Sequence, residues 1–136
     1  MIIDGKKEAA ILRDEIKKEI ETLKSKTKKT PGLSVILIGD FAPSQIYVKN
    51  KEKKSMEVGI NSEIIRYSKE VTEQEVLKKI EELNNNSEVS GILVQLPLPK
   101  QIDKEKIINS ISPFKDVDGF HPINVGNLSS GYNAIV

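Results

Sequence analysis

Apolar residues follow two patterns along the chain, a helical spacing near the start and short unbroken runs farther on. Nearly continuous apolar runs over 33–38 and 91–96 predict strands that are buried on both faces. Residues 61–67, with two isoleucines at their centre, predict a third strand between them. Near the start, apolar residues recur at helical spacing, with lysine and glutamate on the opposite face: Ala9, Leu12, Ile16, Ile20 and Leu23. This spacing predicts a helix that Asp4 caps and that ends before Pro31.

Helix signals also fill the intervals between the predicted strands. A helix is expected from Pro43 to near Gly59, although its apolar positions do not form one line. Thr72 and Glu75 form a capping box, and the apolar positions that follow it predict the next helix. Asp103 is expected to cap a short helix, and residues 115–122 read as a loop because they are rich in turn residues.

Strands that alternate with helices predict an α/β fold with a three-layer arrangement, a parallel sheet covered by helices on both faces. We expect strand order 2-1-3, right-handed crossovers and no internal repeat. The loops after the first and third strands would then border one crevice, which is where open α/β sheets bind ligands.

Composition narrows the possible functions. The 136 residues are most simply one domain, and 21 basic residues against 20 acidic ones do not favour nucleic acid as a partner. The absence of cysteine excludes disulfides and thiolate metal sites. No apolar run approaches the length of a membrane span and the first residues do not form a leader, so we expect a cytoplasmic protein without membrane contact.

The predicted helix after the first strand carries a group of polar side chains. Ser44, Tyr47 and Lys51 are spaced at i, i+3 and i+7, so that a hydroxyl, an aromatic ring and an amine share one face beside a strand end. The alternative is a solvated lysine-rich helix with one half-buried tyrosine.

Other candidate residues lie in the two later segments. Gln95 closes an apolar strand and Asp118 lies in a loop, although a strand-end amide and a turn-forming aspartate are equally plain interpretations. His121 is the only histidine and precedes a proline, so there is no second histidine for a metal site. No Ser-His-Asp set can be argued from one histidine in a turn, and a structural role is favoured. The glycines form neither a dinucleotide fingerprint nor a phosphate loop.

Three motifs in sequence order resemble the bifunctional methylenetetrahydrofolate dehydrogenase/cyclohydrolase family. They occupy residues 39–51, 91–99 and 115–126, and the start of the chain at 4–6 is similar as well. In that family an acidic residue, proline and alanine usually precede the serine that corresponds to Ser44, whereas Phe41, Ala42 and Pro43 precede it here. This difference leaves open where the helix that carries Ser44 begins.

The resemblance implies an enzyme of one-carbon metabolism and purine biosynthesis. The family oxidises 5,10-methylenetetrahydrofolate with NADP and hydrolyses the methenyl product to 10-formyltetrahydrofolate. Residues 1–136 would be the tetrahydrofolate-binding catalytic domain, and the Rossmann domain that holds NADP would follow and is missing. We therefore expect no tight NADP binding to this chain alone. The family is homodimeric, although an isolated domain can be monomeric.

The resemblance also assigns roles. Lys51 would be the central catalytic residue, an uncharged amine that activates water beside a cationic substrate. Gln95 would hold that amine, Tyr47 would offer a ring face to the aminobenzoyl group, and Asp118 would accept hydrogen bonds from the pterin. Ser44 would belong to the lysine network, and Leu96 and Pro97 would line the substrate site. Two alternatives stay open: a folate-binding fragment without dehydrogenase turnover, and an unrelated flavodoxin-like binding module.

Overall fold

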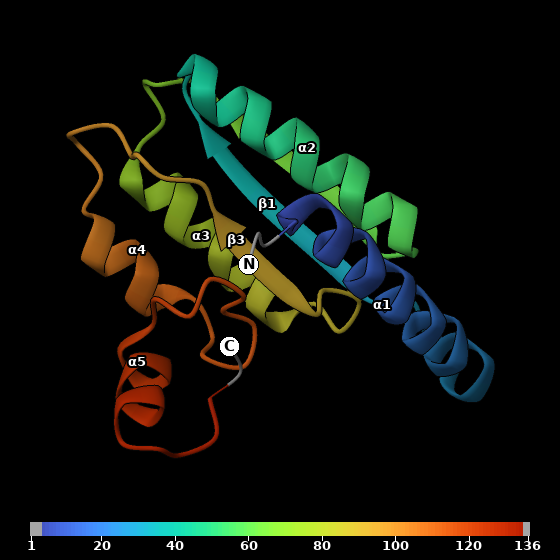
Figure 1. Ribbon diagram of the computed structural model, residues 1–136. Helices are drawn as coiled ribbons and strands as arrows, with labels where there is room; N and C mark the ends of the chain where they lie inside the picture. Colours follow the sequence, from blue (N-terminus) through green and yellow to red (C-terminus); the bar gives the residue numbers. More distant parts are fainter. Residues whose placement is uncertain (1–3, 135–136) are drawn as a thin grey trace.

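The computed structural model describes residues 4–134 and has a three-stranded parallel sheet at its centre (Figure 1). The strands are β1 (Gly32–Ile38), β2 (Asn61–Tyr67) and β3 (Gly91–Val94), arranged in the order β2-β1-β3. Both neighbours of β1 run parallel to it. The predicted sheet and strand order are thus confirmed.

Helices cover both faces of the sheet. One face of β1 packs with Val48 of α2 (Ala42–Val58), and α1 (Gly5–Thr27) lies along α2 on the outside (Figure 1). The opposite face packs against α3 (Glu73–Asn85) and α4 (Lys104–Ser110). The larger part of the core lies there, built around fully buried isoleucines: Ile36, Ile80, Ile92 and Ile107.

The predicted helix caps are present. The Asp4 carboxylate accepts hydrogen bonds from the backbone N–H groups of Lys6 and Lys7. The Thr72 and Glu75 side chains form the reciprocal capping box, and Asp103 caps α4. These caps satisfy backbone N–H groups that have no partner within their own helix.

Three details differ from the sequence predictions. In α1 only Ile20 is buried, whereas Leu12 and Leu23 are exposed, because this helix contacts α2 rather than the sheet. The third strand ends at Val94, two residues earlier than predicted. Residues from Pro122 onward form a further helix, α5 (Pro122–Ser129), that the sequence did not reveal.

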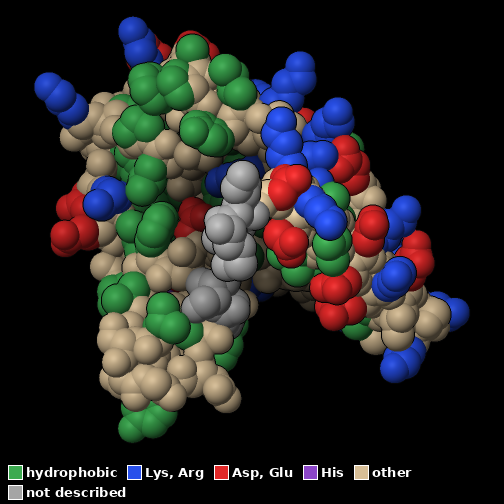
Figure 2. All heavy atoms as spheres, viewed as in Figure 1, with side chains coloured by type: hydrophobic (Ala, Val, Ile, Leu, Met, Phe, Trp, Pro, Cys, Tyr) green, Lys and Arg blue, Asp and Glu red, His purple; other side chains and the backbone are tan. Residues whose placement is uncertain are grey.

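The surface of α1 is rich in charge of both signs. Figure 2 shows lysine and arginine side chains interspersed with aspartate and glutamate over this helix. Within residues 4–134, every helix is too short or too polar to span a lipid bilayer. In the same range no group of three or more potential ligands is arranged to hold a metal ion.

Candidate active site

Lys51 and Gln95 come together from two different elements. Lys51 lies on α2, and Gln95 follows the last residue of β3, where its backbone N–H donates to the carbonyl oxygen of Ile36 on β1 at 2.9 Å. The Lys51 Nζ donates to the Gln95 Oε1 at 3.3 Å, and both residues are half-buried. In the part of the chain that the structure describes, Lys51 makes no ion pair with a carboxylate. The amide is therefore the group that orients this amine.

The carbonyl oxygen of Leu96 holds the other end of the Gln95 amide. It accepts a hydrogen bond from the Gln95 Nε2 at 2.9 Å and a second from the Ser44 Oγ at 3.3 Å. Ser44 is buried at the start of α2. The peptide bond from Leu96 to Pro97 is cis. Ser44 thus joins the lysine network through the Leu96 carbonyl and not through Lys51 itself.

Tyr47 lies one helical turn before Lys51 on α2. It is 63% exposed, so its ring presents a face to solvent instead of contributing to the core. The packed side of α2 is formed by Ser44, Val48, Ser55 and Val58. Serines at two of these four positions explain why the apolar pattern of this helix is weak in the sequence.

Asp118 lies at the surface in the loop between α4 and α5. Loss of hydration raises the pKa of its carboxyl above the ordinary value of 3.8, while the positive charge of Lys51 acts to lower that pKa and Asp116 acts to raise it. The influence of Lys51 places this amine and the Asp118 carboxyl in the same electrostatic neighbourhood.

Asp116, which sequence reasoning did not single out, is the buried carboxylate of this loop. Its Oδ2 accepts hydrogen bonds from the backbone N–H of His121 at 2.8 Å and from the Asn124 Nδ2 at 3.0 Å. The His121 Nδ1 in turn accepts the backbone N–H of Ile123 at 3.2 Å and caps α5. The structural role favoured for His121 is thus seen directly.

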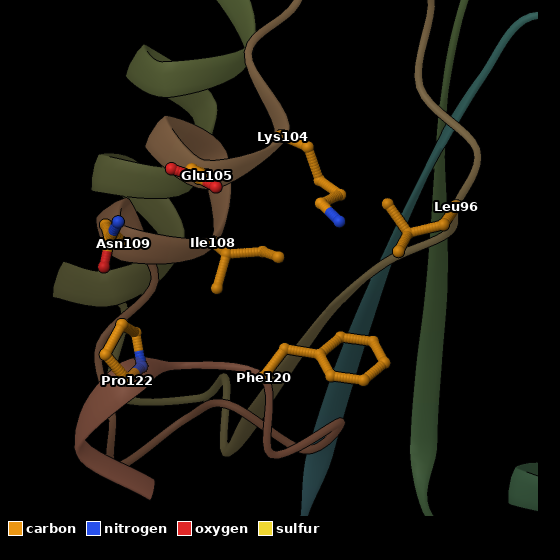
Figure 3. Close-up of a pocket in the computed structure, with 7 residues that line it drawn as sticks. All are labelled: Leu96, Lys104, Glu105, Ile108, Asn109, Phe120 and Pro122. Carbon is orange, nitrogen blue, oxygen red and sulfur yellow. The ribbon is translucent and has the colours of Figure 1, made fainter. Parts of the chain in front are cut away.

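A cavity of about 410 Å³ opens beside this group, on the α4 side. Leu96 and Phe120 border it and Lys104 extends across it from the start of α4, as Figure 3 shows. Leu96 and Phe120 also border a smaller apolar cavity that reaches Asp116 and Asp118. The larger cavity thus shares Leu96 and Phe120 with the cavity that reaches Asp118, but its own lining includes neither Asp118 nor Lys51 nor Tyr47.

This arrangement suits proton transfer beside an aromatic ligand. An amine is held by an amide and not by a carboxylate, a tyrosine ring is exposed one turn away, and a partly dehydrated carboxyl lies nearby. Perturbed carboxyl groups in clefts are typical of functional sites. The geometry brings Ser44, Lys51, Gln95 and Leu96 into one hydrogen-bonded group and leaves Tyr47 and Asp118 without a hydrogen bond to that group.

Comparison with known proteins identifies related sequences. The pattern for the catalytic domain of tetrahydrofolate dehydrogenase/cyclohydrolase matches residues 3–118. The bifunctional protein FolD of Pelagibacter ubique is 63% identical over all 136 residues, which cover 48% of its length. The corresponding protein of Rickettsia akari is 49% identical over 96% of this chain and 44% of its own.

Solved structures agree with these sequence matches. The bifunctional enzyme FolD from Campylobacter jejuni superimposes with a TM-score of 0.93 at 48% identity, over 96% of this chain and 46% of that one. The Trypanosoma brucei FolD, solved with NADP cofactor and an inhibitor, gives a TM-score of 0.94 at 34% identity, over 98% of this chain and 46% of that one. The chain spans about half the length of the curated relatives it matches.

Proposed function

Because this chain belongs to the tetrahydrofolate dehydrogenase/cyclohydrolase family, whose catalytic domain it matches over residues 3–118, we propose that residues 1–136 form the tetrahydrofolate-binding catalytic domain of such an enzyme. The complete enzyme oxidises 5,10-methylenetetrahydrofolate and hydrolyses 5,10-methenyltetrahydrofolate to 10-formyltetrahydrofolate. Family membership removes the unrelated flavodoxin-like module from consideration. The fragment that binds folate without dehydrogenase turnover stays an alternative, since the chain covers half of its relatives.

The hydrogen bond between Lys51 and Gln95 is the observation that carries this proposal. An amine fixed by a neutral amide, with no carboxylate paired to it among residues 4–134, suits a base that works in its uncharged form. The methenyl substrate is a cation, and a second positive charge next to it would be repelled. The amide orients the amine without adding a negative charge.

Hydrolysis then follows as a balanced step. The Lys51 amine takes a proton from a water molecule as the water oxygen bonds to the methenyl carbon. In the tetrahedral adduct the hydroxyl group releases its proton to solvent as its oxygen forms the carbonyl double bond. The bond between that carbon and N5 breaks, and N5 receives the electron pair together with the proton that Lys51 had taken from water. The product carries the formyl group on N10. Gln95 keeps the Lys51 amine at one position through both transfers.

The remaining residues bind the folate. The Tyr47 ring stacks on the aminobenzoyl group, for which an exposed aromatic face is suited. The Asp118 carboxylate accepts hydrogen bonds from the N–H groups at the amide edge of the pterin. Leu96 and Pro97 line the apolar side of the ligand, and the Ser44 hydrogen bond fixes the Leu96 carbonyl.

We expect no tight NADP binding to these residues alone. The glycines of the chain form neither a dinucleotide fingerprint nor a phosphate loop, so we derive no hydride-transfer step from this chain. The NADP of the family belongs to the part of the enzyme that these 136 residues do not cover. We place the complete enzyme in the cytoplasm as a homodimer.

The test is replacement of Lys51 in a fusion of this chain to the part of the Pelagibacter ubique relative that the chain does not cover. Lys51→Ala is expected to lower the rate of methenyltetrahydrofolate hydrolysis at least about 10²-fold, because a positioned base contributes roughly 10² to 10⁴. Lys51→Arg is not expected to restore it, since a guanidinium stays charged. Loss of absorbance of the methenyl substrate measures the rate.

Lysines on the same helix provide matched controls. Lys49 and Lys53 are exposed, and their replacement by alanine should leave most of the activity and change stability by no more than about 0.5 kcal/mol. An unchanged rate in Lys51→Ala would show that another residue is the base. An equal loss in all three variants would point to the charge of the helix surface instead.

A further inference from the structure

The loop that carries Asp118 is attached to the sheet and to α3. The backbone N–H of Ile92 on β3 donates to the carbonyl oxygen of Lys115 at 2.7 Å, so the loop runs beside β3 for a short distance. The Lys115 ammonium donates to three carbonyl oxygens at the C-terminal end of α3, those of Leu83, Asn84 and Asn86, at 2.8 to 2.9 Å. The start of the loop is therefore fixed.

Asp116 fixes the far end of the same loop. It is 2% exposed, and both of its hydrogen bonds are to groups at the start of α5, the backbone N–H of His121 and the Asn124 amide. The Asn124 Nδ2 also donates to the carbonyl oxygen of Pro113, which lies earlier in the same loop. The Asp116 carboxylate thus connects the residue two positions before Asp118 to the start of α5, which follows Asp118 in the chain.

Asp116 and Asp118 are close to each other without being in the same environment. Both border one small apolar cavity with Leu96 and Phe120, yet Asp116 is buried and Asp118 is at the surface. Val117 between them packs against the β1–α2 side of the core. A buried residue that holds a reacting or binding side chain through backbone contacts is a common way to fix a site to within about 0.5 Å.

We infer that Asp116 is a positioning residue, whose hydrogen bonds to His121 and Asn124 set the place from which Asp118 meets the pterin. The identity of the ligand in this inference rests on the proposed function. The positioning role of Asp116 rests on its two hydrogen bonds, to His121 and Asn124. Asp116 does not touch the ligand itself. The negative charge of Asp116 is also one of the causes that raise the pKa of Asp118, which is a second effect that a neutral replacement would remove.

The experiment compares Asp116→Ala, Asp116→Asn, Asp118→Asn and the double variant Asp116→Ala/Asp118→Asn in the 136-residue chain. Binding of 5-formyltetrahydrofolate is measured by calorimetry. Asp116→Ala is expected to weaken binding roughly tenfold in the parent and less than about twofold in the Asp118→Asn background, because coupled residues are not additive. Asp116→Asn keeps an acceptor oxygen for both donors and should bind within about twofold of the parent.

A stability control separates positioning from general damage. Thr72→Ala removes the cap of α3, far along the chain from this loop, and should lower the unfolding temperature without changing folate affinity. An equal loss of affinity from Asp116→Ala in both backgrounds, or no loss in the parent, overturns the inference.

Amide hydrogen exchange over residues 115–121 reports on the loop without any ligand. Faster exchange in Asp116→Ala and unchanged exchange in Asp118→Asn support the positioning role, because local opening is governed by the hydrogen bonds that are lost. Unchanged exchange in Asp116→Ala overturns it. Folate binding that Asp118→Asn leaves unaltered refutes the proposed pterin contact, while the exchange data still decide whether Asp116 positions the loop.

Discussion

Gly91 at the start of β3 is predicted to be necessary for the position of the Asp118 loop. A Cβ atom built at this position lies 2.5 Å from the Val117 Cγ1 and 3.4 Å from the Leu33 Cδ1. The first distance is far below van der Waals contact, and the short, branched Val117 side chain cannot swing away. In Gly91→Ala the displacement would therefore pass to the backbone of Val117, the residue next to Asp118.

The expected cost can be worked from two opposing effects. Overpacking of a core contact destabilises the folded state by about 1–3 kcal/mol. Replacing glycine also restricts the unfolded chain, which favours folding by about 0.4–1 kcal/mol. From the middle of each range the net loss should be about 1.3 kcal/mol. Each kcal/mol should lower the unfolding temperature of a domain this size by about 3–5 °C.

Val117→Ala supplies the matching half of a double-mutant cycle. Alone it should cost about 1 kcal/mol, since the two methyl groups it removes are only partly buried. In the Gly91→Ala background it removes the clashing atom, so the double variant should be no less stable than Val117→Ala alone. Urea denaturation followed by circular dichroism measures all four proteins. Additive losses, or a Gly91→Ala protein as stable as the parent, would refute the clash.

Three further predictions concern charge and cofactor. The folded state holds the Asp118 proton more tightly than the unfolded chain does, because partial loss of hydration raises the pKa of this surface carboxyl. Stability therefore falls as pH rises through that pKa. Asp118→Asn should accordingly unfold at a higher temperature than the parent at pH 7 but at the same temperature near about pH 3; an equal difference at both would contradict this. Lys115→Met should lower the free energy of unfolding by about 1–3 kcal/mol, because three carbonyl oxygens at the end of α3 lose their donor. Urea denaturation measures this loss. Lys78 is an exposed lysine of α3, so Lys78→Met should leave the free energy of unfolding almost unchanged. Calorimetric titration of residues 1–136 with NADP should show no micromolar binding, since the chain lacks a glycine fingerprint.

The sheet and its caps could be predicted because each has a local signal. Apolar runs marked β1 and β3, a pair of isoleucines marked β2, and Thr72 with Glu75 marked the start of α3. The helix α5 has no such signal: Pro122 reads as the end of a loop, Gly126 lies inside the helix, and the cap is a histidine nitrogen. The third strand ends early because Gln95 keeps one backbone hydrogen bond to β1 but belongs to no full strand pair.

For the candidate site, residue types were predictable and partners were not. The spacing on α2 placed Tyr47 and Lys51 together, but only the fold shows that Gln95, from another element, accepts a hydrogen bond from the Lys51 Nζ. Asp116 and Asp118 look equivalent in the sequence. Burial distinguishes them, because it depends on how the loop is attached to β3 and α5. Their individual functional roles stay predictions.

The contact between Lys51 and Gln95 joins positions 44 residues apart, with all of β2 and α3 between them along the chain. It exists only in molecules in which β3, a strand of four residues, has already docked on β1. A local opening of this short strand would separate the two side chains without unfolding α2. A folate molecule bound across both would favour the docked strand by mass action, so that the substrate itself would slow hydrogen exchange in β3.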